Sequence, residues 1–200
     1  MTKKTLHILA CDAFSYELEA LRKKFSLEDI FKCKIDITYL TQKLHVDFSK
    51  LETAVCLTLN TIQADAIILL YGSKCHPNFE SILPAKKIFL LEENNCMHAI
   101  TGKDTQDCPR TFFLNPLQVK NWRKFFAYDI KNDDEKVVFK ENFCKYCDNA
   151  TFFDTQVCNI SKEQLHFFEQ ATGLPVKTNV IGLEPFQKTF FATIEKALAK

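Results

Sequence analysis

Four residues that can bind a soft or borderline metal ion each follow a run of apolar residues in the first half of the chain. Cys11 follows TLHILA, His45 follows KIDITYL, Cys75 follows AIILLYG and Cys96 follows KKIFLLE. Thiolate and imidazole are the usual ligands of zinc in proteins, and four of them can close a tetrahedral shell. Three thiolates and an imidazole also suit an iron–sulfur cluster, in which histidine can replace cysteine. The four residues lie far apart in the sequence, so only the fold can bring them together.

The apolar runs predict the strands of an α/β protein. We expect strands over residues 5–10, 34–40, 66–72 and 86–92, and helical spacing predicts helices over 13–25 and 48–62. The alternation continues with strands over 111–115, 150–155 and 177–182, and with helices from Pro116 through Phe126, over 161–173 and over 184–200. Such alternation predicts a Rossmann-like open, mostly parallel sheet with helices on both faces. Because such sheets bind ligands beyond the carboxyl ends of their strands, we expect the four residues to meet at that edge.

We predict a single α/β domain over residues 1–200. The alternative is two αβ halves joined by a hinge near residues 127–136, because DIKNDDEK at 129–136 is polar and charged and is typical of an exposed loop.

Composition excludes several classes of function. Lys and Arg number 26 against 25 Asp and Glu, so nothing electrostatic favours nucleic acid or an anionic membrane as a partner. No apolar run approaches the ~20 residues of a membrane span, and charges follow the first apolar residues at once, so we expect a cytoplasmic protein without a signal peptide. With four glycines, the chain has neither a dinucleotide-binding fingerprint nor a P-loop.

The remaining cysteines are weaker candidates. Nine cysteines without an export signal indicate thiols or metal ligands rather than disulfides, and we expect Cys33 and Cys56 to be small buried apolar residues. Cys144 and Cys147 form a C-x-x-C pair, which can be redox-active or half of a zinc site. Cys108 and Cys158 could add ligands to it, but the pair lacks the strand-and-turn context of a thioredoxin-like motif, and no second C-x-x-C exists.

Other histidines and polar residues surround the four candidates. His76 and His98 could replace His45 as a ligand or carry protons, although a role at the surface is the simpler expectation for each. His7 lies within a strand and is expected to be a hydrogen-bonded core residue. Glu92, Glu93 and Asn94 precede Cys96 and could orient a ligand. The alternative to a metal site is that the cysteines are buried thiols and the histidine is incidental.

Five stretches resemble, in order, the motifs of domain-of-unknown-function family sixteen-thirty-eight. They are LACDAFSYEL, YLTQKLHVDFSKL, AIILLYGSKC, NNCMHAITG and TFFLNPLQVKNW, and the resemblance covers roughly residues 5–195, including all four candidate ligands. Asp12, His76 and Asn95 depart from the residues usual in that family, which are glycine, glycine and aspartate. The resemblance implies a link to anaerobic, corrinoid-dependent methyl metabolism, with a corrinoid protein or a methyltransferase subunit as partner and a corrinoid reached through it.

Three hypotheses about function remain open. The first is an enzyme component, such as a zinc-dependent methyltransferase subunit, in which Cys11, His45, Cys75 and Cys96 hold a metal ion used in methyl or thiol transfer. The second is a non-catalytic protein that binds or carries an iron–sulfur cluster or another metal cofactor. The third is a structural zinc site in a binding module. An open coordination position beside a pocket would favour the first.

Overall fold

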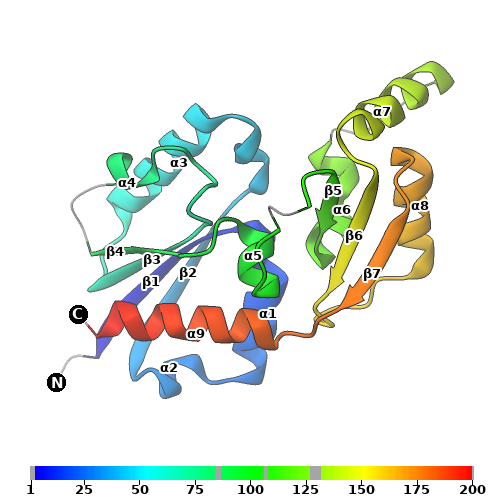
Figure 1. Ribbon diagram of the computed structural model, residues 1–200. Coiled ribbons are helices and arrows are strands. Elements are labelled where there is room, and N and C mark those ends of the chain that lie inside the picture. Colours follow the sequence, from blue (N-terminus) through cyan, green and yellow to red (C-terminus); the bar gives the residue numbers. More distant parts are fainter. Residues whose placement is uncertain (1–2, 84–86, 106–107, 127–131, 200) are drawn as a thin grey trace. The chain divides into compact units, whose positions relative to one another are not determined.

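The protein is an α/β protein with parallel strand pairing, as the sequence predicts, but its strands form two sheets rather than one (Figure 1). The computed structural model describes residues 3–83, 87–105, 108–126 and 132–199. The chain divides into two compact units: unit 1 comprises residues 1–103 and 184–200, and unit 2 comprises residues 104–183. We therefore describe each unit by itself.

Unit 1 contains a four-stranded parallel sheet in the order β2-β1-β3-β4. Its strands are β1 (Lys4–Cys11), β2 (Cys33–Leu40), β3 (Ala66–Leu70) and β4 (Ile88–Leu90). Two 3-10 helices, η1 (Asp12–Phe14) and η2 (Gln42–Val46), follow β1 and β2. The α-helices are α1 (Ser15–Lys24), α2 (Leu27–Ile30), α3 (Phe48–Thr61), α4 (Phe79–Ile82), α5 (Cys96–Thr101) and α9 (Glu184–Leu198).

The order of these strands creates a switch point between β1 and β3. The connection after β1 leads to β2 on one side of this point, and the connection after β3 leads to β4 on the other side. Ile8 in β1 pairs with Ile37 of β2 on one side and with Ile68 of β3 on the other. Ile8 and Ile68 are fully buried, as expected for central parallel strands.

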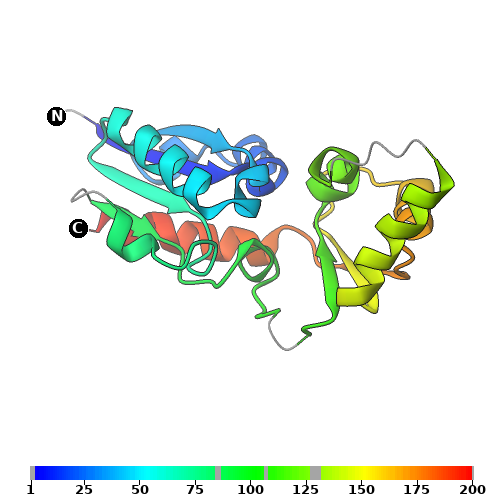
Figure 2. The ribbon, with the colours of Figure 1, turned by 90° about the horizontal axis from the view of Figure 1, so that it is seen from above.

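Helices cover both faces of this sheet. In Figures 1 and 2, α1 and α9 lie on one face and α3 lies on the other. Aromatic side chains fix α9 in place: the Phe186 ring stacks on that of Phe14 at 5.5 Å between centroids, and Phe191 contacts both Phe25 and Phe31. The first half of the chain and its last helix therefore share one core.

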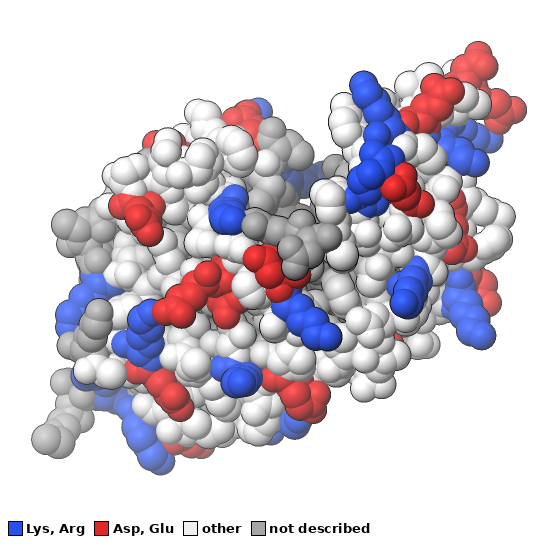
Figure 3. All heavy atoms as spheres, in the orientation of Figure 1, with Lys and Arg blue, Asp and Glu red and all other residues white. Residues whose placement is uncertain are grey.

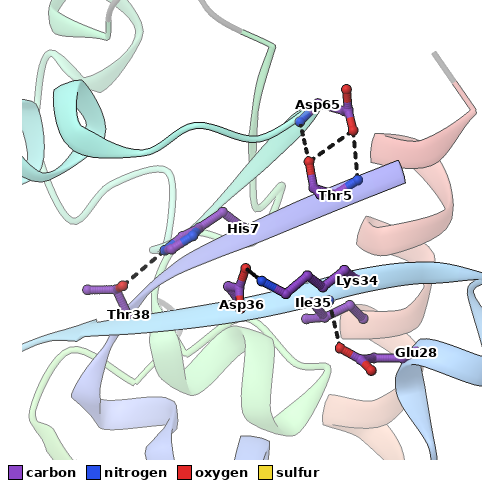
Figure 4. A network of polar contacts seen from close by, with 8 residues as sticks. All are labelled: Thr5, His7, Glu28, Lys34, Ile35, Asp36, Thr38 and Asp65. Atoms are coloured by element: carbon purple, nitrogen blue, oxygen red, sulfur yellow. Dashed lines mark hydrogen bonds and ion pairs between the residues drawn. The ribbon is translucent and has the colours of Figure 1, made fainter. Parts of the chain in front are cut away.

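Polar contacts tie the strands of unit 1 to their neighbours (Figure 4). Asp65, just before β3, accepts hydrogen bonds from the backbone N–H and the hydroxyl of Thr5, at 2.7 and 2.9 Å. His7 contacts the Thr38 hydroxyl at 3.0 Å and is half-buried. His7 is thus hydrogen-bonded within the sheet, as predicted.

Unit 2 contains a three-stranded parallel sheet in the order β5-β6-β7. Its strands are β5 (Thr111–Leu114), β6 (Asn149–Asp154) and β7 (Val176–Val180), and its helices are α6 (Pro116–Phe125), α7 (Asp133–Tyr146) and α8 (Lys162–Thr172). A separate apolar core holds it together, built around Leu114, Trp122, Phe152, Phe168 and Leu174. Asn115 and Ser161 begin α6 and α8 with capping boxes, completed by Gln118 and Gln164.

The structure differs from the sequence-based prediction in the number of sheets and in the helix α7. The strands form two sheets, and the boundaries between the units fall at residues 103–104 and 183–184, whereas the segment 127–136 belongs to unit 2. Residues 127–131 lie outside the described part of the chain. The acidic stretch from Asp133, which we predicted as a loop, is the first turn of α7; Asn132 caps this helix, and acidic side chains favour a helix amino terminus.

On the face shown in Figure 3, the side chains of Lys and Arg intermingle with those of Asp and Glu. Among the helices that the structure describes, none has the length and apolar character needed to cross a membrane.

Candidate functional site

The four candidate ligands all lie in unit 1, at or just beyond the carboxyl ends of its strands. Cys11 is the last residue of β1, His45 lies in η2 after β2, Cys75 follows β3, and Cys96 is the first residue of α5 after β4. Cys11 and Cys75 belong to the connections on either side of the switch point, which is where doubly wound sheets bind ligands.

The ionisation of Cys96 and of Cys11 is affected by neighbouring thiols. Burial is the main cause that raises the pKa of each, to about 11 for Cys75, to about 12 for Cys96 and well above the ordinary value for Cys11. The charge of Cys75 adds to the increase in the pKa of Cys96, and the charges of Cys96 and Cys75 add to the increase for Cys11. The sheet therefore brings three cysteines from distant parts of the sequence into one cluster, which we call the thiol cluster.

Gly72 allows the loop after β3 to pack directly on the loop after β4. A Cβ atom at this position would lie 2.3 Å from the Asn95 Cα and 2.5 Å from the Asn94 carbonyl oxygen. Two backbone hydrogen bonds join the same loops, from the Ser73 N–H to the Glu93 carbonyl (2.8 Å) and from the Lys74 N–H to the Asn94 carbonyl (2.9 Å). This close approach brings Cys75 to the start of α5, where a hydrogen bond from the Cys96 backbone partly offsets the rise in the Cys75 pKa.

Asp12 links the loops after β1 and β2. Its Oδ1 accepts a hydrogen bond from the Gln42 N–H at 2.7 Å, and burial raises the pKa of its carboxyl group. The preceding residue, Cys11, caps η1, because its sulfur accepts a hydrogen bond from the Ala13 N–H at 3.5 Å. Asp12 thereby holds the turn that carries His45 beside the end of β1.

The hydrogen bonding of His45 leaves its Nε2 able to bind a metal. Burial lowers the His45 pKa, so the neutral ring is favoured. Its Nδ1 lies 3.0 Å from the Gln42 carbonyl oxygen, and because a carbonyl only accepts hydrogen bonds, this nitrogen carries the proton. The Nε2 lone pair is then free, which is the usual arrangement of a metal-binding histidine. The ring stacks on Tyr71, with 5.7 Å between centroids.

His76 and His98 have the opposite arrangement. The Nδ1 of His76 accepts a hydrogen bond from the Asn78 N–H at 3.1 Å, and the Nδ1 of His98 accepts one from the Asn94 N–H at 3.2 Å. In the neutral ring the proton of each is therefore on Nε2, while the lone pair of Nδ1 accepts this hydrogen bond, so neither nitrogen offers a lone pair to a metal ion. The surface role expected for His76 is wrong, because its side chain is 3% exposed and packs on Phe79. His98 is half-buried.

Two buried polar residues of the site were not singled out from the sequence. Tyr71 is fully buried at the end of β3, and in the part of the chain that the structure describes its hydroxyl has no hydrogen-bond partner. Burial, followed by the charges of Cys11 and Cys75, raises the Tyr71 pKa far above its ordinary value. Glu17 is also fully buried, and its charge contributes to the raised pKa of Cys96.

The sequence contains a signal for one of these residues. Glu17 lies three residues after Phe14 and four before Leu21, so it shares the apolar face of its helix with them. A carboxyl group on a buried helical face requires a partner or a function. Tyr71 has no such signal, because an aromatic residue at the end of a buried strand is ordinary core composition.

The polar residues before Cys96 have other contacts. Glu92 forms an ion pair with Lys196 of α9, and Glu93 accepts a hydrogen bond from the Thr189 hydroxyl at 3.4 Å. Asn95, not Asn94, caps α5, and its side chain accepts a hydrogen bond from the His98 N–H at 2.9 Å. Gly102 ends this helix in the left-handed conformation.

The donor types of the thiol cluster suit a soft metal ion, but their present arrangement does not close a coordination shell. Among the residues that the structure describes, no three His, Cys, Asp or Glu side chains are grouped so that they could hold a metal ion. Reorientation of the thiol groups and of the His45 ring would be needed for binding.

The other cysteines belong to other elements of the chain. Cys33 is buried and Cys56 half-buried. The C-x-x-C pair belongs to unit 2: Cys144 lies in the last turn of α7, where its sulfur contacts the Thr172 carbonyl at 3.6 Å, and Cys147 follows that helix. Burial raises the Cys147 pKa, which does not favour a reactive thiolate. Any role of this pair stays a prediction.

The fold and the switch-point cluster place the chain among doubly wound α/β proteins whose candidate site lies at the carboxyl edge of a parallel sheet. The chain belongs to the family described as "Protein of unknown function (DUF1638)", whose model matches residues 39–190. This membership confirms the resemblance seen in the sequence motifs. The matched region includes His45, Cys75 and Cys96, and Cys11 precedes it. Neither a curated protein nor a solved structure matches the chain.

Proposed function

We propose that this protein binds a thiophilic metal ion at the carboxyl edge of the unit 1 sheet. Cys11, Cys75 and Cys96 would be the thiolate ligands and His45 the fourth ligand, with zinc as the first candidate and an iron–sulfur cluster as the second. The observation that supports this most is that three thiols follow β1, β3 and β4 at one edge of the sheet, where the charge of Cys75 raises the pKa of Cys96 and the charges of Cys96 and Cys75 raise the pKa of Cys11.

The chain's own groups prepare the site in two ways. Burial keeps the thiols protonated near neutral pH when no cation is present, so the core does not hold three unpaired negative charges. A divalent cation would displace these protons, because only deprotonated sulfur is a strong ligand. The contact of His45 with the Gln42 carbonyl would meanwhile hold the imidazole neutral, with its Nε2 lone pair available.

We further propose that the site acts in methyl or thiol transfer, with a corrinoid protein or a methyltransferase subunit as partner. A zinc ion bound by thiolates supplies the activation of a thiol acceptor near neutral pH. Membership of the family supports the transfer reaction only through the metabolic link that the sequence resemblance implies. The transfer reaction is therefore argued less directly than the metal site.

The second candidate function is a non-catalytic protein that binds or carries an iron–sulfur cluster or another metal cofactor. The limited exposure of the candidate ligands favours it, since Cys11 is 2% exposed and His45, Cys75 and Cys96 are half-buried. A closed site with four protein ligands suits a carrier or a structural centre, whereas catalysis requires an exchangeable position.

Metal analysis of protein purified without oxygen tests the proposal. We expect one zinc ion per chain, or iron with sulfide and a brown colour, in the wild type, and loss of the metal in Cys75→Ser. Cys56→Ser is the matched control, because Cys56 lies on α3 and is half-buried outside the thiol cluster. Folded wild-type protein that contains no metal and takes up neither Zn²⁺, Co²⁺ nor iron would rule the proposal out.

The occupancy of the shell separates the two candidate functions. Bound Co²⁺ shows a thiolate-to-metal charge-transfer band in the near ultraviolet, and an added small thiol changes this band only if a coordination position is exchangeable. A change on adding the thiol would favour transfer chemistry, and an unchanged spectrum would favour the carrier function.

A further inference from the structure

The C-x-x-C pair of unit 2 spans the last turn of α7. Cys144 lies in this turn and Cys147 is the residue that follows it, two residues before β6 begins (Figure 1). The Cys147 N–H donates a hydrogen bond to the Phe143 carbonyl at 2.9 Å, so the backbone is helical as far as the Cys147 nitrogen. In an α-helix, the Cα atoms of residues three apart are about 5 Å from each other. A disulfide requires Cα atoms about 4.4–6.8 Å apart, so the backbone holds the two cysteines at a separation that a disulfide can span.

The end of the helix also allows the two side chains to meet. Inside a helix, Cβ atoms three residues apart are separated by about 5–6 Å, whereas a disulfide holds them at about 3.5–4.5 Å. Cys147 has left the helical conformation, with a φ of −130° and a ψ of 146°, so a rotation at this terminal residue can close the gap without breaking a hydrogen bond of the helix. Burial is the main cause that raises the pKa of Cys147, and the charge of Cys144 adds to the increase, which agrees with two sulfur atoms close together.

The two cysteines differ in access, and a positive charge acts on the less accessible one. Cys144 is exposed and Cys147 is half-buried. The charge of Arg110 opposes the effect of burial on the Cys147 pKa, and it does so more strongly than the Asp148 carboxylate adds to that effect. Arg110 is held in place because its Nε and Nη2 donate hydrogen bonds to the two carboxylate oxygens of Asp148, at 2.7 and 2.6 Å. An oxidant in solution can therefore reach Cys144 first, while Arg110 supports ionisation of its neighbour.

We propose that Cys144 and Cys147 form a reversible disulfide by exchange with a low-molecular-weight disulfide. The Cys144 thiolate attacks one sulfur of the small disulfide, which breaks the S–S bond of that molecule and releases one small thiol after protonation. The Cys147 thiolate then attacks the Cys144 sulfur and releases the second small thiol. The pair thereby loses two electrons and two protons, and the small disulfide gains both. This site belongs to unit 2 and does not depend on the metal site proposed for unit 1.

Oxidation removes one contact of the reduced protein, which favours reversibility. The Cys144 sulfur contacts the Thr172 carbonyl, in the last turn of α8, at 3.6 Å. A disulfide sulfur carries no proton, so this hydrogen bond is lost when the disulfide forms. The lost contact and the adjustment at the end of α7 both stabilise the thiol form relative to the disulfide, so small thiols should reduce the bond readily.

Oxidised glutathione, added to the reduced full-length protein, tests the proposal. Trypsin cleaves after Lys145, which lies between the two cysteines, so peptides 141–145 and 146–162 stay joined only when a disulfide links them. After alkylation of the remaining thiols, we expect mass spectrometry to find these joined peptides with a Cys144–Cys147 bond and without bound glutathione. Dithiothreitol should restore both thiols.

Two variants separate the roles of the cysteines. In Cys147→Ser, Cys144 should keep glutathione as a stable mixed disulfide, because the second attacking thiol is missing. In Cys144→Ser, Cys147 should react with glutathione about 10-fold more slowly than Cys144 does in Cys147→Ser, because Cys147 is half-buried. Cys108→Ser is the matched control: Cys108 is exposed like Cys144 but precedes β5, so the joined peptides should form as in the wild type.

Four results would overturn the proposal. The first is wild-type protein in which Cys144 keeps bound glutathione or in which neither cysteine reacts. The second is a bond from Cys144 to Cys108 or Cys158 in place of Cys147. The third is a Cys144–Cys147 disulfide that forms in urea but not in the folded chain, since the end of α7 would then prevent the bond. The fourth is an equal or faster reaction of Cys147 in Cys144→Ser, which contradicts the order of attack.

Discussion

Gly72→Ala should break the link that holds Cys75 next to the start of α5. The added Cβ would meet the Asn95 Cα at 2.3 Å, the Asn94 carbonyl oxygen at 2.5 Å and the Asn95 backbone nitrogen at 2.5 Å. All three atoms belong to the backbone, so no flexible side chain can move aside. The loops after β3 and β4 must therefore separate.

The structure sets the size of the effect. Separation would break the hydrogen bonds from Ser73 to Glu93 and from Lys74 to Asn94, at about 0.5–1.5 kcal/mol each. If the loops instead stay together, the overpacking costs about 1–3 kcal/mol. Either response lowers the free energy of unfolding by roughly 1–3 kcal/mol, a large fraction of the about 5–15 kcal/mol typical of a folded domain.

The assay is urea unfolding of the metal-free protein, followed by Co²⁺ titration of each folded variant. Gly102→Asn is the matched control, because Gly102 has a φ of +68°, which asparagine adopts more readily than other residues, and a Cβ there would meet only Pro185 Cβ at 3.6 Å. We expect the control to lose less stability than Gly72→Ala and to keep the cobalt affinity, whereas Gly72→Ala should lose affinity as Cys75 moves away from Cys96. Wild-type stability and affinity in Gly72→Ala would refute the argument.

Three further predictions follow from the buried groups. The pKa of Cys75 is about 11 in the folded protein, against an ordinary value of 9.0, so the unfolded chain loses this proton at lower pH than the folded chain. The contribution of the protonated thiol to the free energy of unfolding is therefore complete below about pH 9 and is lost as the pH rises through 11. Between about pH 8 and about pH 10.5, urea unfolding should show Cys75→Ala losing about 2 kcal/mol less than the wild type; equal losses would contradict this. Glu17→Gln removes a negative charge that raises the Cys96 pKa, so alkylation of Cys96 in a Cys11→Ala, Cys75→Ala background should begin at lower pH; an unchanged pH profile would show that Glu17 does not act on it. Phe168→Ala should destabilise unit 2 by about 3–5 kcal/mol, because Phe168 is fully buried in its core, yet leave cobalt binding unchanged in folded protein; a parallel loss of binding would mean that the site is not confined to unit 1.

The central strands and the order of the fold could be predicted because they depend on local patterns. AIILL at β3 is apolar at every position and is buried at every position, so the run alone identifies a strand covered on both faces. The placement of Cys11 and Cys96 at strand or helix ends followed from the same patterns. Parallel strands then place their carboxyl ends at one edge without further information.

The division into two sheets could not be predicted in the same way. The sequence around β5 shows the same alternation of strand and helix as the sequence around the earlier strands. Only pairing between residues far apart in the sequence decides that β5 joins β6 rather than β4. α7 was missed for a different reason. Its first residues are Asp133, Asp134 and Glu135, which suggest a loop when taken as composition, although they favour a helix start once Asn132 caps it.

The candidate site could be predicted only in part. The sequence shows which residues can be ligands, but it does not show which groups those residues hydrogen-bond. Cysteine and histidine can be recognised as possible metal ligands from residue type alone, so His45, His76 and His98 were all candidates. Which nitrogen of each ring carries the proton depends on the group opposite it, a carbonyl for His45 and a backbone N–H for the other two. No spacing rule contains that information. The unpaired hydroxyl of Tyr71 is equally a property of the packed structure.

The charges around Cys11 indicate what kind of ion the site can accept. Burial raises the pKa of Cys11 most, and the charges of Cys96, Asp12 and Cys75 raise it further. All three of these side chains are acids, so their charges are negative. In the proposed site, the positive charge that stabilises three thiolates would therefore come from the metal ion. A divalent cation with three thiolates has one net negative charge, so a neutral imidazole from His45 suits the fourth position better than another thiolate would.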